Sequence, residues 1–323
     1  MDDITLRAQR DLIISEFVGR DKIVNNIQHI YERALTAAEA AANDKSIEAG
    51  HLAQGVSAFT QRLQTRLREE DGPRAGSSPY KGLLAYRLAD AELFFGRSHA
   101  IRELLEHLER GPFTVLHAES GAGKTSLLQA GLFPRLIVAG HLPVYLRPYN
   151  VEPSLALKRA FLADLGLTPL LATAPLNDFL RQVGGVLGPQ TRLFVCLDQF
   201  EEFFTQLEEP ARAEFVRELA ECLDDEGLNA RWIISMRAEF LSRLGNFRPR
   251  VRNPFENDYL LNRLTRAEAS EAVLEPAARR GLSFEAGLVD RILDDLGKGE
   301  VQPPQIQLVC SALHDELKPG ETT

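Results

Sequence analysis

A glycine-rich turn between an expected strand and an expected helix constrains this chain more than any other feature of its sequence. Residues 118–128 are AESGAGKTSLL, and the apolar, β-branched run 113–117 precedes them. This order predicts a buried strand, a tight turn and a helix that begins near Lys-Thr. Glycine lets the backbone of such a turn wrap an anion, because no Cβ stands in the way. The free N–H groups of the first helical turn then bind phosphate oxygens, so the stretch predicts a nucleoside triphosphate site.

The residue types in this phosphate-binding loop (P-loop, residues 118–125) suggest separate roles. The Lys124 ammonium can reach the terminal phosphates, and the Thr125 hydroxyl can ligate Mg²⁺. The other phosphate-binding candidates are Ser120, Gly121, Ala122, Gly123 and Ser126. The pattern usually opens with glycine, and Ala118 stands there instead, which still fits if its φ is negative. The alternative is an ordinary glycine-rich turn, which leaves the Lys-Thr pair in register unexplained.

Composition limits the class of protein. A chain of 323 residues is long enough for about two domains, at ~150 residues each. Its net charge of −9 disfavours nucleic acid as the main partner, because neutralising phosphates needs clustered Lys and Arg. The three cysteines, Cys196, Cys222 and Cys310, have no CxxC spacing and predict reduced, buried thiols. No apolar run approaches the ~20 residues of a membrane span and no signal peptide is evident, so we expect a cytoplasmic protein.

The organisation along the chain follows from apolar periodicity and turn signals. Two expected helices in residues 1–70 each carry apolar residues on one face, which predicts an antiparallel hairpin. Packing on the main domain and an independent oligomerisation, effector or adaptor module are equally compatible with this pattern. The expected units are an N-terminal helical segment (1–70), a linker (71–78), a nucleotide-binding domain (79–264), a helical lid (265–318) and a tail (319–323).

Four further apolar runs predict strands, at 143–147, 192–198, 231–237 and 259–261. The continuous apolar pattern of 192–198 is typical of a central parallel strand that is buried on both faces. The expected fold class is therefore α/β, with a mainly parallel sheet. Asp198 ends this run, at the sheet edge where ligands bind, and can hold Mg²⁺. Either Glu201 or Glu202 can orient and deprotonate an attacking water, and the alternative is an acidic helix N-terminus favoured by the dipole.

Two more features border the expected site. Arg237 ends the fourth strand, where a cation could contact the γ-phosphate and so distinguish ATP from ADP; a surface role is the alternative. The segment Phe94–Arg97 places two aromatic residues before Gly-Arg, and these either stack on adenine or belong to the core. The basic run Arg248–Arg252 fits an inter-subunit contact or a solvated turn.

Five motifs occur in a fixed order over roughly residues 79–316. They are YKGL (80–83), FFGR (94–97), the P-loop, LDQFEEF (197–203) and MRAEF (236–240). This ordered set resembles the STAND signal-transduction ATPases, specifically the bacterial novel STAND group, which is related to NACHT and NB-ARC proteins and to AAA+ ATPases.

The resemblance implies a three-layer αβα domain with a helical lid, ATP or ADP and Mg²⁺ as ligands, and slow hydrolysis. It also implies a switch, monomeric with ADP and self-associating with ATP, often in antiviral defence or regulated cell death. It assigns the P-loop roles to Lys124 and Thr125, the Mg²⁺-side acid to Asp198, the water-positioning acid to Glu201 or Glu202, nucleotide sensing to Arg237, the adenine side to Phe95, Gly96 and Arg97, and a lid proline to Pro304.

Two departures from the family pattern bear on activity. Gln199 follows Asp198 where many AAA+ ATPases place a catalytic glutamate, which favours slow hydrolysis. The expected C-terminal sensor is missing after residue 318, so the sensor or effector lies either in a missing C-terminal region or in a separate chain. The competing hypotheses are an AAA+-like ATPase with continuous turnover, a DNA-associated ATPase that uses residues 248–252, and, least favoured, a small-molecule kinase.

Overall fold

The computed structural model describes residues 18–43, 47–69, 78–147, 151–162, 164–297, 299–317 and 322. The expected linker lies outside this part except for residue 78, and the expected tail lies outside it except for residue 322. The structure therefore describes almost all of the region that contains the five motifs and the lid.

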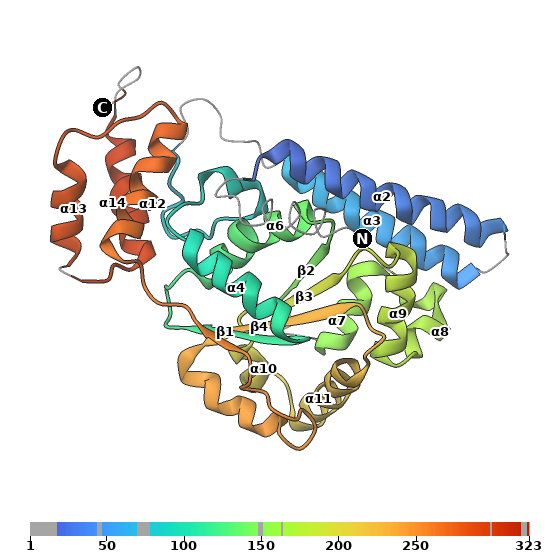
Figure 1. The fold of residues 1–323 in the computed structure, drawn as a ribbon. Coiled ribbons are helices and arrows are strands. Elements are labelled where there is room, and N and C mark those ends of the chain that lie inside the picture. Colours follow the sequence, from blue (N-terminus) through green and yellow to red (C-terminus); the bar gives the residue numbers. More distant parts are fainter. Residues whose placement is uncertain are drawn as a thin grey trace.

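A five-stranded sheet forms the centre of the molecule (Figure 1). Its strands are β1 (Phe113–Ala118), β2 (Leu142–Leu146), β3 (Leu193–Leu197), β4 (Ala230–Arg237) and β5 (Asp258–Leu260). Their order is β2-β3-β4-β1-β5, and every neighbouring pair is parallel. All five predicted strands are confirmed, each within one residue of its expected ends. Parallel pairing brings the carboxyl ends to one edge, where Ala118 of β1 lies opposite Arg237 of β4.

Helices cover both faces of the sheet, which confirms the three-layer α/β class. Leu116 and Ile233 pack with α4 and the helix after the P-loop, whereas Val115 and Ile234 pack with α7, α9 and α11 on the other face. Because successive side chains point to opposite faces and helices cover both, β1 and β3 are buried at every position. The helices of this domain are η1 (Leu88–Leu93), α4 (Ser98–Arg110), α5 (Lys124–Ser126), η2 (Leu127–Leu132), α6 (Phe133–Val138), α7 (Pro153–Phe161), η3 (Leu165–Leu167), α8 (Pro169–Thr173), α9 (Leu176–Leu187), α10 (Glu201–Gln206), α11 (Glu209–Asp224) and η4 (Ala238–Phe247).

The helix that follows the P-loop is less regular than the helix that the sequence predicts to begin near Lys-Thr. Its middle part, η2, is π-helical. Pro134 opens the next turn and has no N–H to donate to the carbonyl four residues earlier, which loosens the regular hydrogen-bond pattern. The Arg135 guanidinium donates to Gly131 O at 2.7 Å, inside the buried part of this helix.

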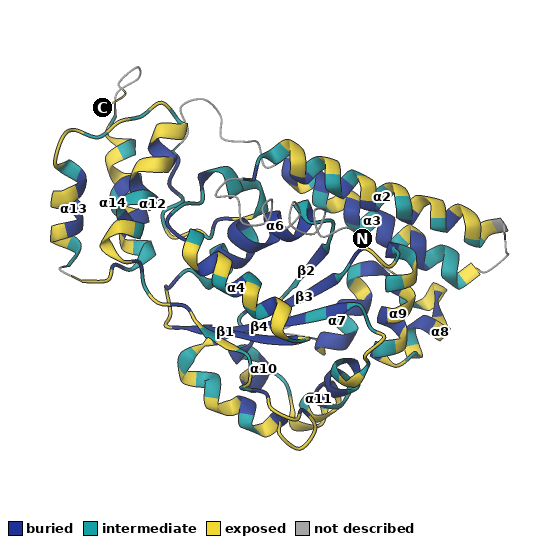
Figure 2. Ribbon diagram, in the orientation of Figure 1, coloured by how far each residue is buried: buried dark blue, intermediate teal, exposed yellow. Residues whose placement is uncertain are grey.

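The N-terminal helices α2 (Arg20–Asn43) and α3 (Ile47–Glu69) form the expected hairpin. The hairpin lies along α6, α7 and α9, with its exposed side turned away from the sheet (Figure 2). Ile30 and Val56 are fully buried and join the main apolar core. Glu48 accepts hydrogen bonds from the backbone N–H groups of Leu170 and Leu171, at 3.2 and 3.0 Å, at the start of α8. Of the two arrangements that the sequence left open, the structure has the hairpin packed on the main domain.

The C-terminal helices α12 (Arg266–Arg279), α13 (Leu288–Leu296) and α14 (Pro303–Asp315) form a lid with its own apolar core. Thr265 and Glu268 cap the start of α12 in a reciprocal box, and α14 opens with two prolines, which the first helical turn tolerates. The three cysteines are free and buried, as expected. Among the described residues, no helix has the length and apolar character that a membrane span requires.

Candidate functional site

A cavity of about 260 Å³ lies at the carboxyl edge of the sheet, between the P-loop and the lid. It brings together most of the residues that the sequence singled out. Its lining contains residues 82–86, Leu93, Phe94, Phe95, Arg97, residues 120–126, Asp198, Gln199, Glu201, Arg237, Leu264, Ala272, Pro303, Pro304, Ile306 and Gln307. Glu202 and Gly96, both predicted site residues, are not part of the lining. The site is therefore built from five parts of the chain that lie apart in sequence: residues 82–97, 120–126, 198–201, 237 and 264–307.

The P-loop has the conformation that its glycines allow. Gly121 and Gly123 have φ of 81° and 94°, in the left-handed region that favours glycine. The Lys124 ammonium donates to the carbonyl oxygens of Ala118 and Glu119, both at 3.3 Å, so it lies across the loop. Burial lowers the pKa of Lys124, while Glu201 and Asp198 oppose that shift. Anionic phosphates would favour the protonated amine further.

Arg97 contacts the backbone of the P-loop through a hydrogen bond. Its guanidinium is almost fully buried and donates to Ala122 O at 2.8 Å. Burial lowers the pKa of Arg97, and nearby Glu268 opposes the shift. Gly96 lies against the lid: a Cβ there would be 2.3 Å from Glu268 O. The predicted adenine-side pair thus contacts both the P-loop and helix α12.

The Mg²⁺-side candidates lie within hydrogen-bond distance of each other. The Thr125 hydroxyl donates to Asp198 Oδ2 at 2.6 Å, and Asp198 is completely buried. The Tyr145 hydroxyl, from β2, donates to the same oxygen at 2.8 Å. These oxygen donors suit Mg²⁺, which is usually held by one or two protein oxygens together with phosphates and water. Across the described residues, no cluster of three or more His, Cys, Asp or Glu side chains could hold a metal by itself.

The two glutamates differ in their surroundings. Glu201 faces the cavity: its Oε1 is 3.2 Å from Arg237 Nε, and its Oε2 accepts the Arg237 backbone N–H at 3.2 Å. Glu202 lies outside the cavity, 3.6 Å from an Arg147 guanidinium nitrogen. Both residues are in the first turn of α10, so the acidic helix N-terminus that the sequence left as an alternative is also present.

Gln199 joins β3 to α10 in a strained conformation. Its φ of 53° is the only positive value at a non-glycine position among the residues that the structure describes. Such strain concentrates at functional sites. The Gln199 side-chain oxygen accepts a hydrogen bond from Arg147, at the end of β2, and the next residue, Phe200, donates its N–H to Ser235 O at 2.8 Å. Gln199 lines the cavity with an amide, which does not act as a proton acceptor at neutral pH.

The aromatic pair lies at the other end of the cavity. Phe94 packs against Tyr86, with ring centroids 5.7 Å apart, and it also joins the apolar core. Phe95 lies beneath the Arg279 guanidinium, 5.8 Å from its ring centroid. Both rings line the cavity. The sequence left open whether these residues form a wall on which adenine stacks or belong to the core, and Phe94 has both positions, in the cavity wall and against the core.

The two prolines that open α14 lie against the P-loop. A Cβ at Gly121 would be 3.5 Å from Pro304 Cγ, and one at Gly123 would be 3.7 Å from Pro303 Cγ. The predicted lid proline, Pro304, therefore lies at the P-loop end of the cavity. Sequence reasoning missed Tyr145, Arg147 and the lid residue Gln307, because their place in the site depends on strand register and on how the lid packs.

Comparison with known proteins identifies related sequences and folds. A family described as Novel STAND NTPase 1 matches residues 79–322, and no curated protein matches the chain. The Walker-type ATPase PABY2304 of Pyrococcus abyssi has a similar structure, with 17% identity, coverage of 72% of this chain and 71% of that one, and a TM-score of 0.51. The ORC2 protein of Aeropyrum pernix, in a structure with ADPNP and ADP, has 17% identity, coverage of 74% and 64%, and a TM-score of 0.50. This chain spans slightly less than two thirds of the ORC2 chain, and both likenesses concern the fold.

Proposed function

Because the chain belongs to the Novel STAND NTPase 1 family, we propose that it is an ATP-dependent signalling switch. In this proposal the resting form is a cytoplasmic ADP-bound monomer, and ATP drives self-association. Hydrolysis is slow and resets the switch. The output, in bacterial defence or regulated signalling, passes through an effector or sensor module.

The observation that carries the proposal is the shared lining of the cavity. The P-loop forms one wall, and the lid residues Pro303, Pro304 and Gln307 form another. A nucleotide bound there would contact both parts, so a difference of one phosphate could favour one lid position over another. A ligand shifts a conformational equilibrium when it binds the two states with different affinity.

The geometry of the described residues supports a role for each. The N–H groups of residues 120–126 and the Lys124 ammonium would bind the phosphates. Thr125 and Asp198 would hold Mg²⁺, which neutralises phosphate charge when bound. Glu201, inside the cavity, would position the attacking water, and its neighbour Arg237 would contact the γ-phosphate. Gln199 places an amide near the same end, which supports slow turnover.

Light scattering with identification of the retained nucleotide tests the switch. The measurement compares wild type with Lys124→Ala, each with ADP or with ATP and Mg²⁺. We expect wild type to be a monomer with ADP and larger with ATP, and the variant to retain neither nucleotide. A wild type that keeps one size with both nucleotides while it hydrolyses ATP steadily would instead establish the AAA+-like ATPase with continuous turnover.

Nucleic acid is not part of the proposal, because the net charge of −9 opposes it. The surface that a DNA-associated ATPase would use is nonetheless well defined. Arg248, Arg250 and Arg252 are exposed, and the Arg248 guanidinium lies 5.3 Å from the Phe255 ring centroid. Salt-dependent DNA binding that is lost on Arg250→Glu would contradict a purely protein-directed switch.

A further inference from the structure

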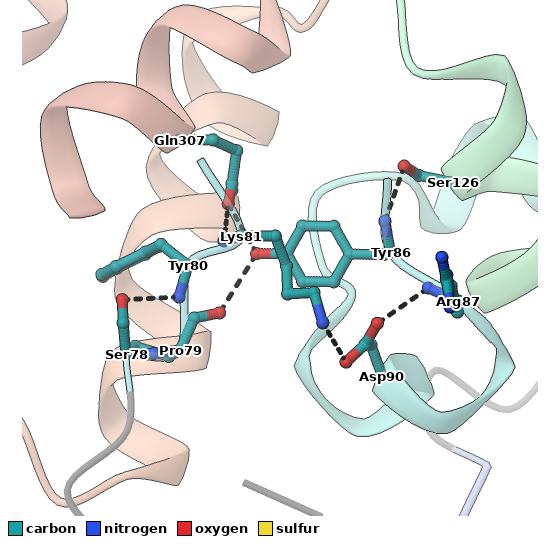
Figure 3. Close-up of polar contacts among 9 residues, drawn as sticks. All are labelled: Ser78, Pro79, Tyr80, Lys81, Tyr86, Arg87, Asp90, Ser126 and Gln307. Carbon is teal, nitrogen blue, oxygen red and sulfur yellow. Dashed lines mark hydrogen bonds and ion pairs between the residues drawn. The ribbon is translucent and has the colours of Figure 1, made fainter. Parts of the chain in front are cut away.

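The segment 79–86, which we call the strap, joins the lid to the nucleotide-binding domain (Figure 3). Tyr80, near its start, is buried in the apolar core of the lid. Its hydroxyl donates to Val273 O, in the middle of α12, at 2.7 Å. Although Tyr80 precedes α12 by almost two hundred residues, it is part of the lid in three dimensions.

The strap holds α14 through one side chain, Gln307. The Gln307 Oε1 accepts the Lys81 backbone N–H at 2.9 Å and the Tyr86 hydroxyl at 2.8 Å (Figure 3). The single proton of this hydroxyl also lies within reach of Pro79 O, in the strap itself, at the longer distance of 3.1 Å. An amide oxygen has two lone pairs, and these two donors occupy both. Burial raises the pKa of Tyr86, so its hydroxyl keeps its proton and remains a donor. Gln307 is 9% exposed, which protects both bonds from competing water.

The far end of the strap is attached to the P-loop helix. The Tyr86 backbone N–H donates to Ser126 Oγ at 3.1 Å, one residue after Thr125. The Tyr86 side chain packs with Leu93 and Ala130 of the nucleotide-binding domain. Tyr86 thus holds the lid through its hydroxyl and the P-loop helix through its backbone.

We propose that Tyr86 and Gln307 form a latch that keeps the lid seated over the cavity and so sets how slowly a bound nucleotide leaves. The inference rests on the proposed binding of ATP or ADP in this cavity. Both residues line the cavity, and the two bonds to Gln307 exist only while α14 lies against the strap. A nucleotide enclosed between the P-loop and α14 leaves after the lid moves, so its dissociation rate follows the population of the open lid.

The test measures the dissociation rate of mant-ADP by stopped-flow displacement with excess ADP. Gln307→Met removes the acceptor of both bonds with little change of shape. Each lost bond should raise the open population about fivefold, so the loss of both bonds should make dissociation about 25-fold faster in Gln307→Met. Gln305→Met, two residues away on the exposed side of α14, is the matched control and should leave the rate unchanged.

A double-mutant cycle separates the latch from a general loosening of the lid. Tyr86→Phe should raise the rate about fivefold. Adding it to Gln307→Met should give no further increase, because Gln307→Met has already removed the Tyr86–Gln307 bond and the remaining partner of the Tyr86 hydroxyl, Pro79 O, belongs to the strap and not to the lid. Equal rates for wild type and Gln307→Met, or multiplicative effects in the double variant, would overturn the latch while nucleotide binding stands. If wild type binds no mant-ADP at all, the proposed function is overturned and the latch with it.

Discussion

Helix α3 crosses the end of α7 at Gly55, closer than any side chain allows. A Cβ at this position would lie 2.0 Å from Phe161 O and 3.0 Å from Phe161 C, whereas ordinary contact begins at 3.4 Å. Gly55→Ala must therefore move α3 away from α7 by roughly 1 Å or more. The atoms in the way belong to the backbone of α7, so no rotation of a side chain relieves the clash.

The expected magnitude follows from two opposing contributions. Overpacking of a well-packed contact costs about 1–3 kcal/mol, and a backbone obstacle places the cost at the upper end. Alanine gains about 1 kcal/mol over glycine inside a helix. We therefore expect Gly55→Ala to lower the free energy of unfolding by about 2 kcal/mol. Gly50→Ala in the same helix is the matched control: its nearest neighbour would be Ala41 Cβ at 4.0 Å, so it should stabilise by about 0.5–1 kcal/mol.

Urea denaturation followed by circular dichroism measures both variants. A shift of the midpoint at constant m-value reports stability directly. Opposite signs for Gly55→Ala and Gly50→Ala would support a hairpin that is docked on α7. If Gly55→Ala were as stabilising as Gly50→Ala, the contact with Phe161 would not exist in solution, and the hairpin would be the independent module that the sequence also allowed.

Three further predictions concern the site and the pH dependence of folding. In steady-state phosphate release, Glu201→Gln should lower ATP hydrolysis at least tenfold, and Glu202→Gln, outside the cavity, should change it less than threefold; the reverse order would refute the assignment. Gln199→Glu should raise the same rate severalfold by adding a proton acceptor, and an unchanged rate would count against the amide as the cause of slow turnover. Burial, reinforced by Arg192, lowers the pKa of His141 to about 4. The neutral ring therefore contributes its full stabilisation above the unfolded pKa near 6.5, and about 3 kcal/mol of it is lost as the pH falls towards 4. Urea titrations at pH 7 and 4.5 should show a smaller decrease in the free energy of unfolding for His141→Phe than for wild type. An equal decrease in the variant would disprove the assignment to His141.

The local sequence pattern was sufficient to predict the elements that are buried on both sides. The run at 192–198 is apolar because β3 lies in the middle of the sheet, and that context leaves a clear signal in sequence. The short helix α8 and the ten-residue η4 were not predicted, since tertiary contacts rather than periodicity define them. The π-helical η2 has a local cause in Pro134, but a run of apolar residues conceals it.

The candidate site divides in the same way. Lys124, Thr125 and Asp198 could be placed together from sequence, because parallel strands end at one edge and the P-loop follows one of them. Tyr145 and Arg147 could not, since their contacts with Asp198 and Gln199 depend on the register of β2 against β3. A search of the neighbouring strand end for polar side chains would have found both.

The contact between the lid and the nucleotide-binding domain is the part that sequence patterns reach least. Tyr80 belongs to the apolar core of the lid, whereas Tyr86 belongs to a separate cluster with Leu93 and Ala130. Tyr80 and Tyr86 are six positions apart, so a short segment connects two apolar cores. A single residue, rather than a periodic face, anchors the segment in each core. Periodicity reports burial averaged over a whole helix face. It therefore predicts the lid and the nucleotide-binding domain, but it does not predict how the two pack against each other. The lid and the nucleotide-binding domain are joined by the Tyr86 hydroxyl and the Gln307 amide. Their hydrogen bond connects residues that are 221 positions apart in sequence, so only the structure identifies it.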